Sequence, residues 1–455
     1  DPSMRGIGNA LHHGDGGETL EPVAHGVADD QVEGVVHMGL AFGTPVVIGH
    51  RGAQATVALD ALDGAARQAL AVDVALAALR GGALALALCM AALARRFPDV
   101  GSPADYIGAA FGATAGFLIG WSFLAANWPS IAALAAAAAS YFSVFAPGLT
   151  AHPTLASLAF LAAVTLVNLV GLRTASYFQV ATTALKLTPL ILVILLVARL
   201  AGSDSVPVIL PLPAEGLSLS AMAQAGAITM FALIGFETLT GLTDRIRNPE
   251  RNVPRALFGG TLFVGILYLI VCSAILLLMP PAELAASHAP FADFVQWQLG
   301  DLPARVVAVL AGVSAVGAMN GFVMFCGELP AAMARRGMFP RWFAHANRVG
   351  TPVRSILFTS LIAAVLILSS TSSTSSTLGG LFSAMALLTT STAVWLYLAC
   401  ALTALHFRIA IPAALLSVAF SIWILVGSGV GTSLLSIVLM LAGLPLFWKA
   451  RAEAR

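Results

Sequence analysis

Long apolar runs, separated by short polar connections, follow one another from residue 81 to the C-terminus. Eleven of them are apolar enough to predict membrane-spanning helices, since a helix that crosses a bilayer needs about 20 apolar residues. They cover residues 81–94, 107–143, 154–171, 175–198, 218–243, 256–279, 303–333, 353–370, 378–404, 409–427 and 430–447. The first is short, whereas 107–143 and 303–333 are long enough to tilt or to project beyond the bilayer. The pattern predicts an all-α polytopic membrane protein whose main domain covers residues 81–455.

Residues 1–80 form a different segment, polar and rich in alanine. They hold ten of the 22 acidic residues, five of the nine histidines and one aromatic residue, Phe42. Their longest apolar run, Met38 to Gly49, is too short for a spanning helix, and no signal peptide is recognisable. Two interpretations stay open: the segment is frameshifted or otherwise foreign sequence, or Met38 to Gly49 belongs to a divergent first helix.

Composition agrees with a membrane protein and gives no sign of an enzyme. Hydrophobic residues make up 58% of the chain and charged residues 10%, and the mean hydropathy is +0.90. An ordinary soluble domain is about 25% charged. The four cysteines lie in apolar segments without a CxxC pair, which predicts packing residues, not disulfides or metal ligands. No metalloprotease, nucleophile-elbow or phosphate-loop motif is present, so we expect no catalysis, no cofactor and no metal site.

The distribution of lysine and arginine predicts the orientation in the membrane. Alternate connections, together with the C-terminal tail, carry sixteen of these residues, whereas the intervening connections carry Arg199 and Arg305 alone. Because basic residues gather on the cytoplasmic side, the C-terminus is predicted to be cytoplasmic. Eleven spans would leave residues 1–80 outside the cell, and twelve would bring both termini inside. We therefore expect about twelve helices, the first of them poorly encoded, or not encoded, by residues 1–80.

Glu237 is the first candidate for function. It lies seven residues before Asp244, which marks the start of a basic loop, and is therefore about 10 Å deep at the helical rise. A carboxylate at the centre of a bilayer costs roughly 2.5–3.5 kcal/mol on insertion scales, so such a residue is read as functional by default. Gly235 and Gly241 flank it and allow the backbone to leave helical geometry. The alternative is a glutamate that reaches the cytoplasmic face with the help of a kink.

Lys186 is the second intramembrane charge. It lies 13 residues from both Arg173 and Arg199, about 20 Å of helix either way, which places it near the middle of its span. A buried lysine favours its neutral form and can exchange a proton near neutrality, so Lys186 and Glu237 are predicted to act in proton coupling or gating. The alternative is a lysine that only braces the carbonyl groups of an interrupted first helix.

A family resemblance enters with the residues around Glu237. The runs GFE and RNPERNVPRA, between Gly235 and Ala256, resemble the sixth-helix signature of the amino acid–polyamine–organocation transporters. Three further stretches match in the same order: ALARRFPDVGSPADYIGAAFG from Ala92, RRGMFPRWFAHANRVGTPV from Arg335 and WILVGSG from Trp423. The resemblance runs from about Gly81 to the C-terminus. It is strongest to the branch of basic amino acid exchangers that includes the arginine/agmatine antiporter.

The resemblance implies a fold and a substrate site. The fold would be a 5+5 inverted repeat with interrupted first and sixth helices, and the substrate would sit at mid-membrane between the two breaks. Ile234 and Gly235 would supply the break in the sixth helix, where free backbone groups hold the substrate's amino or carboxyl group. The small-residue motif of the family's first helix has no match between Asp1 and Arg80. Without such a helix the chain as written is not expected to transport.

Aromatic residues complete the candidate substrate-binding set. By resemblance, Phe231 takes the place of a gating aromatic on the sixth helix and Phe322 that of an aromatic that stacks on the substrate. Asn320 begins the same NGFVMF stretch, and Trp128 lies mid-span beside Asn127 and Ser130. Basic amino acid exchangers tend to have tryptophan at both aromatic positions, and a phenylalanine face attracts a cation less strongly. Ordinary packing is the alternative for each of these residues.

These observations favour a secondary amino acid transporter, a permease or exchanger that works by alternating access and is coupled to protons. A basic amino acid/polyamine antiporter and a non-transporting nutrient sensor on the same fold stay open as alternatives. The expected partners are a small amino acid or amine, protons and the bilayer of the cytoplasmic membrane; no nucleic acid is expected. The sequence leaves open which amino acid is moved, whether transport is uniport, symport or antiport, and whether the protein is a homodimer.

Overall fold

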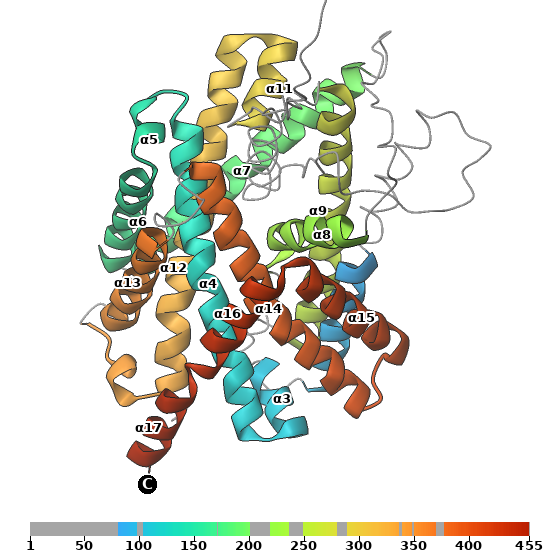
Figure 1. The fold of residues 1–455 in the computed structure, drawn as a ribbon, viewed down its shortest axis with the longest axis vertical. Coiled ribbons are helices and arrows are strands. Elements are labelled where there is room, and N and C mark those ends of the chain that lie inside the picture. Colours follow the sequence, from blue (N-terminus) through green and yellow to red (C-terminus); the bar gives the residue numbers. More distant parts are fainter. Residues whose placement is uncertain are drawn as a thin grey trace, which may run out of the picture.

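The computed structural model describes residues 81–97, 103–170, 172–200, 219–235, 249–279, 289–335, 339–347, 350–369 and 377–454. Within these ranges every regular element is helical (Figure 1). Residues 1–80, with the run from Met38 to Gly49 and the expected first helix, lie outside them.

The described helices follow the predicted order. The first covers residues 81–96. It is followed by α3 (Pro103–Phe111), α4 (Ala113–Phe142), α5 (Gly148–Ala151), α6 (Pro153–Val170), α7 (Leu172–Leu200), α8 (Leu219–Leu233), α9 (Pro249–Leu278), α11 (Pro290–Leu299), α12 (Asp301–Arg335), the 3-10 turn η3 (Arg341–Ala344), α13 (Val353–Ser369), α14 (Leu378–His406), α15 (Ile411–Gly427), α16 (Val430–Leu441) and α17 (Leu444–Ala454).

Each of the eleven predicted spans coincides with at least one described helix. Among the described residues, six helical segments are long and apolar enough to cross a membrane: Ala113–Phe142, Pro153–Val170, Pro254–Ile275, Asp301–Arg335, Leu378–His406 and Val430–Glu453. Leu187–Leu200, Val353–Ser369 and Ile411–Gly427 are shorter apolar helices. The protein is therefore an all-α, multi-pass membrane protein.

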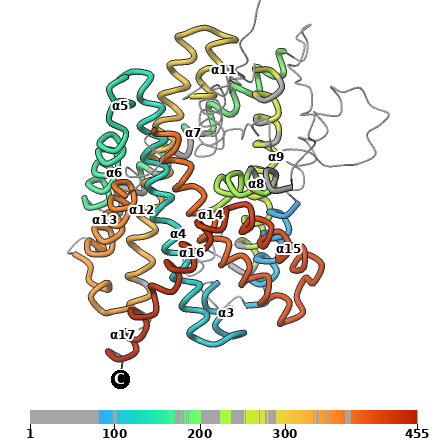
Figure 2. Tube along the Cα trace, viewed as in Figure 1, coloured from blue at the N-terminus to red at the C-terminus, as the bar shows by residue number. Residues whose placement is uncertain are grey.

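Helix α4 occupies the centre of the bundle. Figures 1 and 2 show it passing between α12 and α14, with α6 and α13 on one side. An alanine run, residues 132–139, forms its middle and is buried throughout. Small side chains let neighbouring helix backbones approach closely, which is the main source of helix packing inside a bilayer. The sequence thus places a stretch of mostly small side chains at the middle of the helix that contacts the most neighbours.

The structure divides one predicted span at a single glycine. Residues 107–143 form the end of α3 and the whole of α4, separated by Gly112, whose φ of 91° favours glycine. Helix α3 folds back onto the first turn of α4, where Gly116 lies so close to Ala104 and Gly108 that a Cβ would not fit. The prediction of one long span was wrong here, because both pieces are apolar and one residue separates them.

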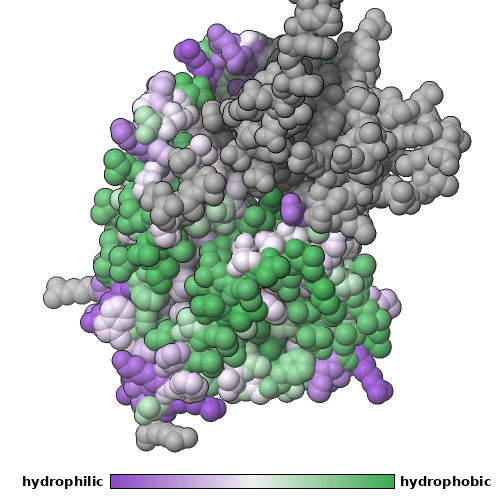
Figure 3. All heavy atoms as spheres, in the orientation of Figure 1, coloured by the Kyte–Doolittle hydropathy of each residue, from purple (hydrophilic) through white to green (hydrophobic). Residues whose placement is uncertain are grey.

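An apolar surface covers the middle of the visible face of the bundle. Figure 3 shows hydrophobic residues over the middle of the visible face and hydrophilic ones gathered at its lower end. Large apolar side chains are exposed along α13 and α16, among them Leu361, Val365 and Val438. A soluble monomer rarely exposes a contiguous surface of this kind, whereas a spanning helix presents it to lipid.

Candidate functional site

Helix α8 ends within the described part of the bundle and carries no charged residue. Its last residue is Leu233, and Ile234 and Gly235 form a turn. The Ile234 N–H donates to the carbonyl oxygens of Met230 and Phe231 at 3.1 and 3.2 Å. Gly235 has a φ of 124°, a conformation in which a side chain is strained. The helix therefore ends where the sequence predicted the break, at Ile234 and Gly235.

The end of α8 carries a partial negative charge. The last carbonyl groups of a helix have no partner within the helix, and the aligned peptide dipoles add about half a negative charge at the C-terminal end. Gly235 allows the chain to turn away just after these carbonyls. An ammonium group is the ligand that this end of a helix attracts.

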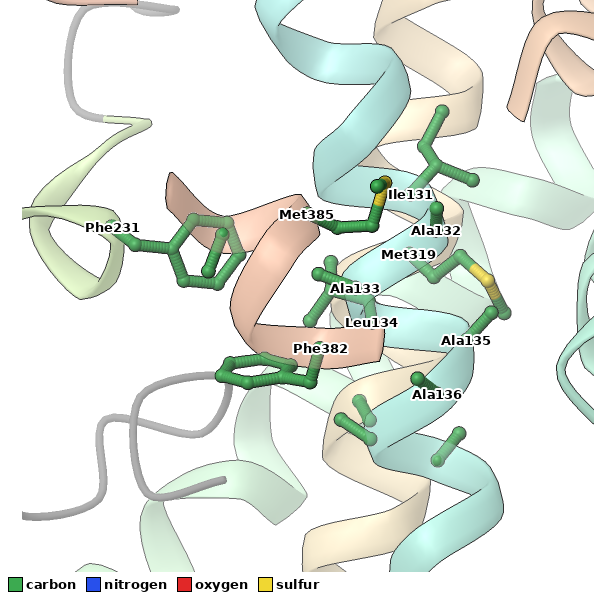
Figure 4. Close-up of a cluster of buried hydrophobic side chains, with 14 of the residues drawn as sticks. Ile131, Ala132, Ala133, Leu134, Ala135, Ala136, Phe231, Met319, Phe382 and Met385 are labelled. Carbon is green, nitrogen blue, oxygen red and sulfur yellow. The ribbon is translucent and has the colours of Figure 1, made fainter. Parts of the chain in front are cut away.

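Two aromatic rings meet beside this helix end. Phe231 on α8 is 7% exposed, and its ring centroid lies 5.6 Å from that of Phe382 on α14, at an interplanar angle of 85°. Figure 4 shows Phe231 reaching toward Phe382 and Met385 of α14, with Met319 of α12 and the middle of α4 next to them. Four helices, α4, α8, α12 and α14, thus converge on one apolar cluster. The rings offer π faces and edges that can contact a cation or an alkyl chain.

Helices α4 and α14 also contribute polar side chains. The Ser130 hydroxyl donates to Thr389 Oγ1 at 3.1 Å and to the Ala126 carbonyl at 3.0 Å. Asn127, buried three residues earlier, donates from Nδ2 to the Phe123 carbonyl. A buried hydroxyl pair and an amide therefore lie with the Phe231–Phe382 ring pair along the contact between α4 and α14. Polar groups of this kind join helices or meet a polar substrate.

Trp128 lies on another face of α4. Its ring is in edge contact with Phe358 of α13 at 5.9 Å and with Trp121 at 5.4 Å between centroids. The side chain is buried against α13, whereas Ser130 meets α14. A substrate contact by Trp128 stays a prediction, and its position favours the packing alternative.

Asn320 and Phe322 lie on different sides of α12. Asn168 of α6 donates from Nδ2 to Asn320 Oδ1 at 2.9 Å, and both side chains are fully buried. Phe322 follows two residues later, about 200° around the helix, and is half-buried against the central apolar cluster. Phe325, on the same side as Phe322, lies 5.5 Å from Phe123 of α4. The structure thus brings Phe322 toward the α4 side of the bundle and Asn320 toward α6.

The two residues predicted for proton coupling lie at the limits of the described structure. Lys186 occupies the midpoint of α7. One turn earlier, Thr182 packs so closely on Gly317 of α12 that a Cβ at Gly317 would not fit. This part of α7 therefore lies against α12, but the Lys186 side chain and all of Glu237 lie outside the described residues. Their roles stay predictions.

Sequence reasoning selected no residue from α14, although the structure places Phe382, Met385 and Thr389 of this helix beside Phe231 or α4. One signal was present. The run from Thr389 to Thr392 sets four hydroxyl-bearing residues in the middle of an apolar span, and all four are fully buried. Polar residues inside a spanning helix mark a site or a polar seam between helices.

Comparison with known proteins finds relatives among transporters. The chain is 28% identical to the cadaverine/lysine antiporter of Escherichia coli K12 over 323 residues, which cover 68% of this chain and 71% of the relative. It is also 28% identical to a putative arginine/ornithine antiporter of Bacillus subtilis strain 168 over 318 residues, which cover 63% of this chain and 67% of that relative. The family and these relatives are transporters, not enzymes.

A sequence model of a whole protein family also matches, over nearly the full length. The model described as amino acid permease aligns with residues 36–449. The match begins before the first described helix and ends within α17. It includes every helix that forms the cluster around Phe231. The chain therefore belongs to the amino acid permease family.

Proposed function

We propose that this chain exchanges a basic amino acid, or the amine related to it, across the cytoplasmic membrane by alternating access. The observation that carries the proposal is the end of α8 beside the Phe231–Phe382 ring pair. A helix C-terminus and an aromatic face both stabilise a cation. Helix α8 offers both although it carries no charged residue. A substrate ammonium group is what this combination favours.

The remainder of the cluster suits an aliphatic stem. Met319, Met385 and Phe382 are buried apolar side chains, and methionine adapts its shape to irregular ligands. The Ser130–Thr389 pair and Asn127 supply hydrogen-bonding groups on one side. A molecule with an ammonium group at one end and a chain of methylene groups would match both surfaces. The relatives named for cadaverine, lysine, arginine and ornithine support this substrate class.

Proton coupling forms part of the proposal. Lys186 lies at the middle of α7, and Glu237 follows the end of α8 by four residues. In alternating access a mid-membrane group faces first one side and then the other, so a protonatable residue can carry a proton in step with substrate. The basic residues on alternate connections support a cytoplasmic C-terminus.

Counterflow in proteoliposomes tests the proposal. The full 455-residue chain is reconstituted, the vesicles are loaded with unlabelled lysine or cadaverine, and uptake of radiolabelled lysine is followed. Internal lysine or cadaverine should accelerate uptake severalfold over vesicles loaded with leucine or buffer. Stimulation by leucine alone would overturn the assignment of a basic substrate. In a chain with a complete first helix restored, saturable binding without flux in any vesicle would assign the protein to the sensor class.

A further inference from the structure

Aromatic rings form a continuous cluster where the first half of α4 meets α13, α17 and the connection that contains η3. Neighbouring ring centroids lie between 4.6 and 6.2 Å apart. The members are Phe117, Trp121 and Trp128 of α4, Phe339, Trp342 and Phe343 of the connection that contains η3, Phe358 of α13, and Phe447 of α17. None of these rings belongs to the Phe231–Phe382 pair.

The aromatic cluster fixes η3 and α17 next to each other. Phe447 stacks on Phe117 at 4.6 Å, which docks α17 on α4. The Arg341 N–H donates to Glu453 Oε2 at 3.0 Å, which joins η3 to the end of α17. Trp121 donates from Nε1 to the Leu439 carbonyl at 2.7 Å and so holds the end of α16. Side chains that project outward from η3 and α17 therefore have defined positions.

Those outward side chains are basic and aromatic. Trp342 and Trp448 are 50% and 62% exposed, respectively. The Arg354 guanidinium lies 5.4 Å over the Trp342 ring and donates to the Trp342 carbonyl at 3.3 Å. Four cations lie on this surface, Arg341, Arg354, Lys449 and Arg451. We call these four residues the basic rim. The carboxylate described among them belongs to Glu453, so the rim keeps a net positive charge.

Two apolar helix faces lead to the basic rim. On α13, Leu357, Leu361 and Val365 are exposed and follow Arg354 at spacings of three, seven and eleven residues, which places all four on one face. On α16, Val438 and Leu441 are exposed before Trp448 and Lys449 of α17. In a bilayer, acyl chains cover such faces and end at headgroups, so both faces bring a headgroup to a tryptophan and a cation.

We propose that the basic rim binds the headgroup phosphate of anionic phospholipids. Tryptophan prefers the interface between hydrocarbon and headgroups. Arginine binds phosphate through two parallel N–H donors, and a juxtamembrane cation adds attraction to an anionic leaflet. The aromatic cluster holds these groups in place before the lipid arrives, which lowers the cost of ordering them. Neither the exchange reaction nor the site near Phe231 is needed for this inference.

Thermal unfolding of the full chain in neutral detergent tests the proposal. Added phosphatidylglycerol should raise the midpoint in a saturable way, whereas phosphatidylcholine should not, because a ligand that binds the folded state alone stabilises it. The variants Arg354→Gln and Lys449→Gln, and the variant in which all four rim cations are glutamine, should each retain the fold in detergent without lipid. Apparent affinity for phosphatidylglycerol should fall roughly fivefold for each cation removed.

Arg251→Gln/Arg255→Gln is the matched control. These arginines are exposed near the start of α9 and are not part of the aromatic cluster or the rim. The control should keep the full response to phosphatidylglycerol, and native mass spectrometry should show the same number of bound lipids as in the parent. If the control variant lost as much of the response to phosphatidylglycerol, diffuse surface charge would explain the effect and the rim would not be a specific site. An equal rise of the unfolding midpoint with inorganic phosphate would show that the ligand need not be a lipid. An undiminished response to phosphatidylglycerol in the Arg354→Gln and Lys449→Gln variants would overturn the proposal.

Discussion

Phe231 and Phe382 meet edge to face at 5.6 Å, and this contact joins the last turn of α8 to the start of α14. The positive edge of one ring faces the negative face of the other, a geometry worth about 0.5–1.5 kcal/mol beyond the buried area. Because α8 ends two residues later at Leu233, the ring pair lies beside the helix end that attracts a cation. A movement of the α8 end relative to α14 must break or remake this contact.

Phe382→Leu should weaken substrate binding more than it weakens the fold. Leucine fills most of the volume of phenylalanine but has no π face, so the cation–π attraction is lost while apolar burial remains. Affinity for lysine or cadaverine should fall roughly two- to thirtyfold, the range expected for loss of such a contact. Scintillation proximity binding on purified protein measures it. Phe160→Leu, at the Phe142–Phe160 stack between α4 and α6, is the matched control and should leave affinity unchanged. Equal affinities in both variants would make Phe382 a packing residue.

Phe322→Ala tests the aromatic residue that the sequence itself indicated. Phe322 is half-buried on α12, so the truncation removes ring area without opening a fully buried cavity. The free energy of binding an amino acid substrate should become less favourable by roughly 0.5–2 kcal/mol. Unchanged affinity for every amino acid and amine tested would remove Phe322 from the site.

Asn320→Leu should lower stability and leave the apparent affinity for substrate as it is. The substitution removes the acceptor of the Asn168 amide in a fully buried place, which costs about 1–3 kcal/mol for the donor left unsatisfied. The double variant Asn168→Leu/Asn320→Leu should recover part of that loss, because the Asn168 amide is then no longer left without its acceptor. Thermal unfolding and transport kinetics are measured on the same preparations. A large rise in KM with an unchanged unfolding midpoint would instead support the predicted contact between Asn320 and the substrate.

The sequence could predict the helices and one break but not the direction of every side chain. Apolar runs of the right length are a strong signal, and Gly235 marked the end of α8 for a physical reason, its freedom at positive φ. The direction of the Trp128 side chain, in contrast, could not be predicted. Helix α4 is apolar and buried on every side, so hydrophobic periodicity contains no information on which face meets α13 and which meets α14. Asn320 was placed in the substrate site by its neighbour Phe322, although two residues on a helix point in nearly opposite directions.

Gly235→Ala tests whether the chain needs its turn at the end of α8. Among the described residues no atom lies within 4 Å of a Cβ built at this glycine, so the expected cost comes from the backbone. A side chain at a φ of 124° should cost about 1–3 kcal/mol and should pull the end of α8 toward ordinary helix. Counterflow should decrease together with the unfolding midpoint. Gly259→Ala on α9, a helical glycine with equally open surroundings, should instead be neutral or stabilising by about 0.5–1 kcal/mol. A Gly235→Ala protein as stable and active as the parent would mean that the turn is not required.

Lys186 provides the test of coupling. It lies at the midpoint of α7, in a segment packed against α12, where Gly317 accommodates Thr182. An ammonium group at that depth of a spanning helix is disfavoured unless a carboxylate pairs with it. Alternating access would expose the amine first to the outside, where it binds a proton, and then to the inside, where it releases it.

An inward proton gradient should therefore accelerate uptake by the parent protein, and a sodium gradient should not. Lys186→Ala should abolish the dependence on the proton gradient, because no group remains to carry the proton. Counterflow of lysine against internal lysine should persist at least in part, because exchange of like substrates needs no net proton movement. Lys186→Arg, which keeps a charge that cannot be neutralised, should lose gradient-driven uptake as well, and this separates proton transfer from a bracing role. If uptake is equal with and without a pH gradient, and Lys186→Ala behaves like the parent, Lys186 is structural and the transporter works by passive exchange.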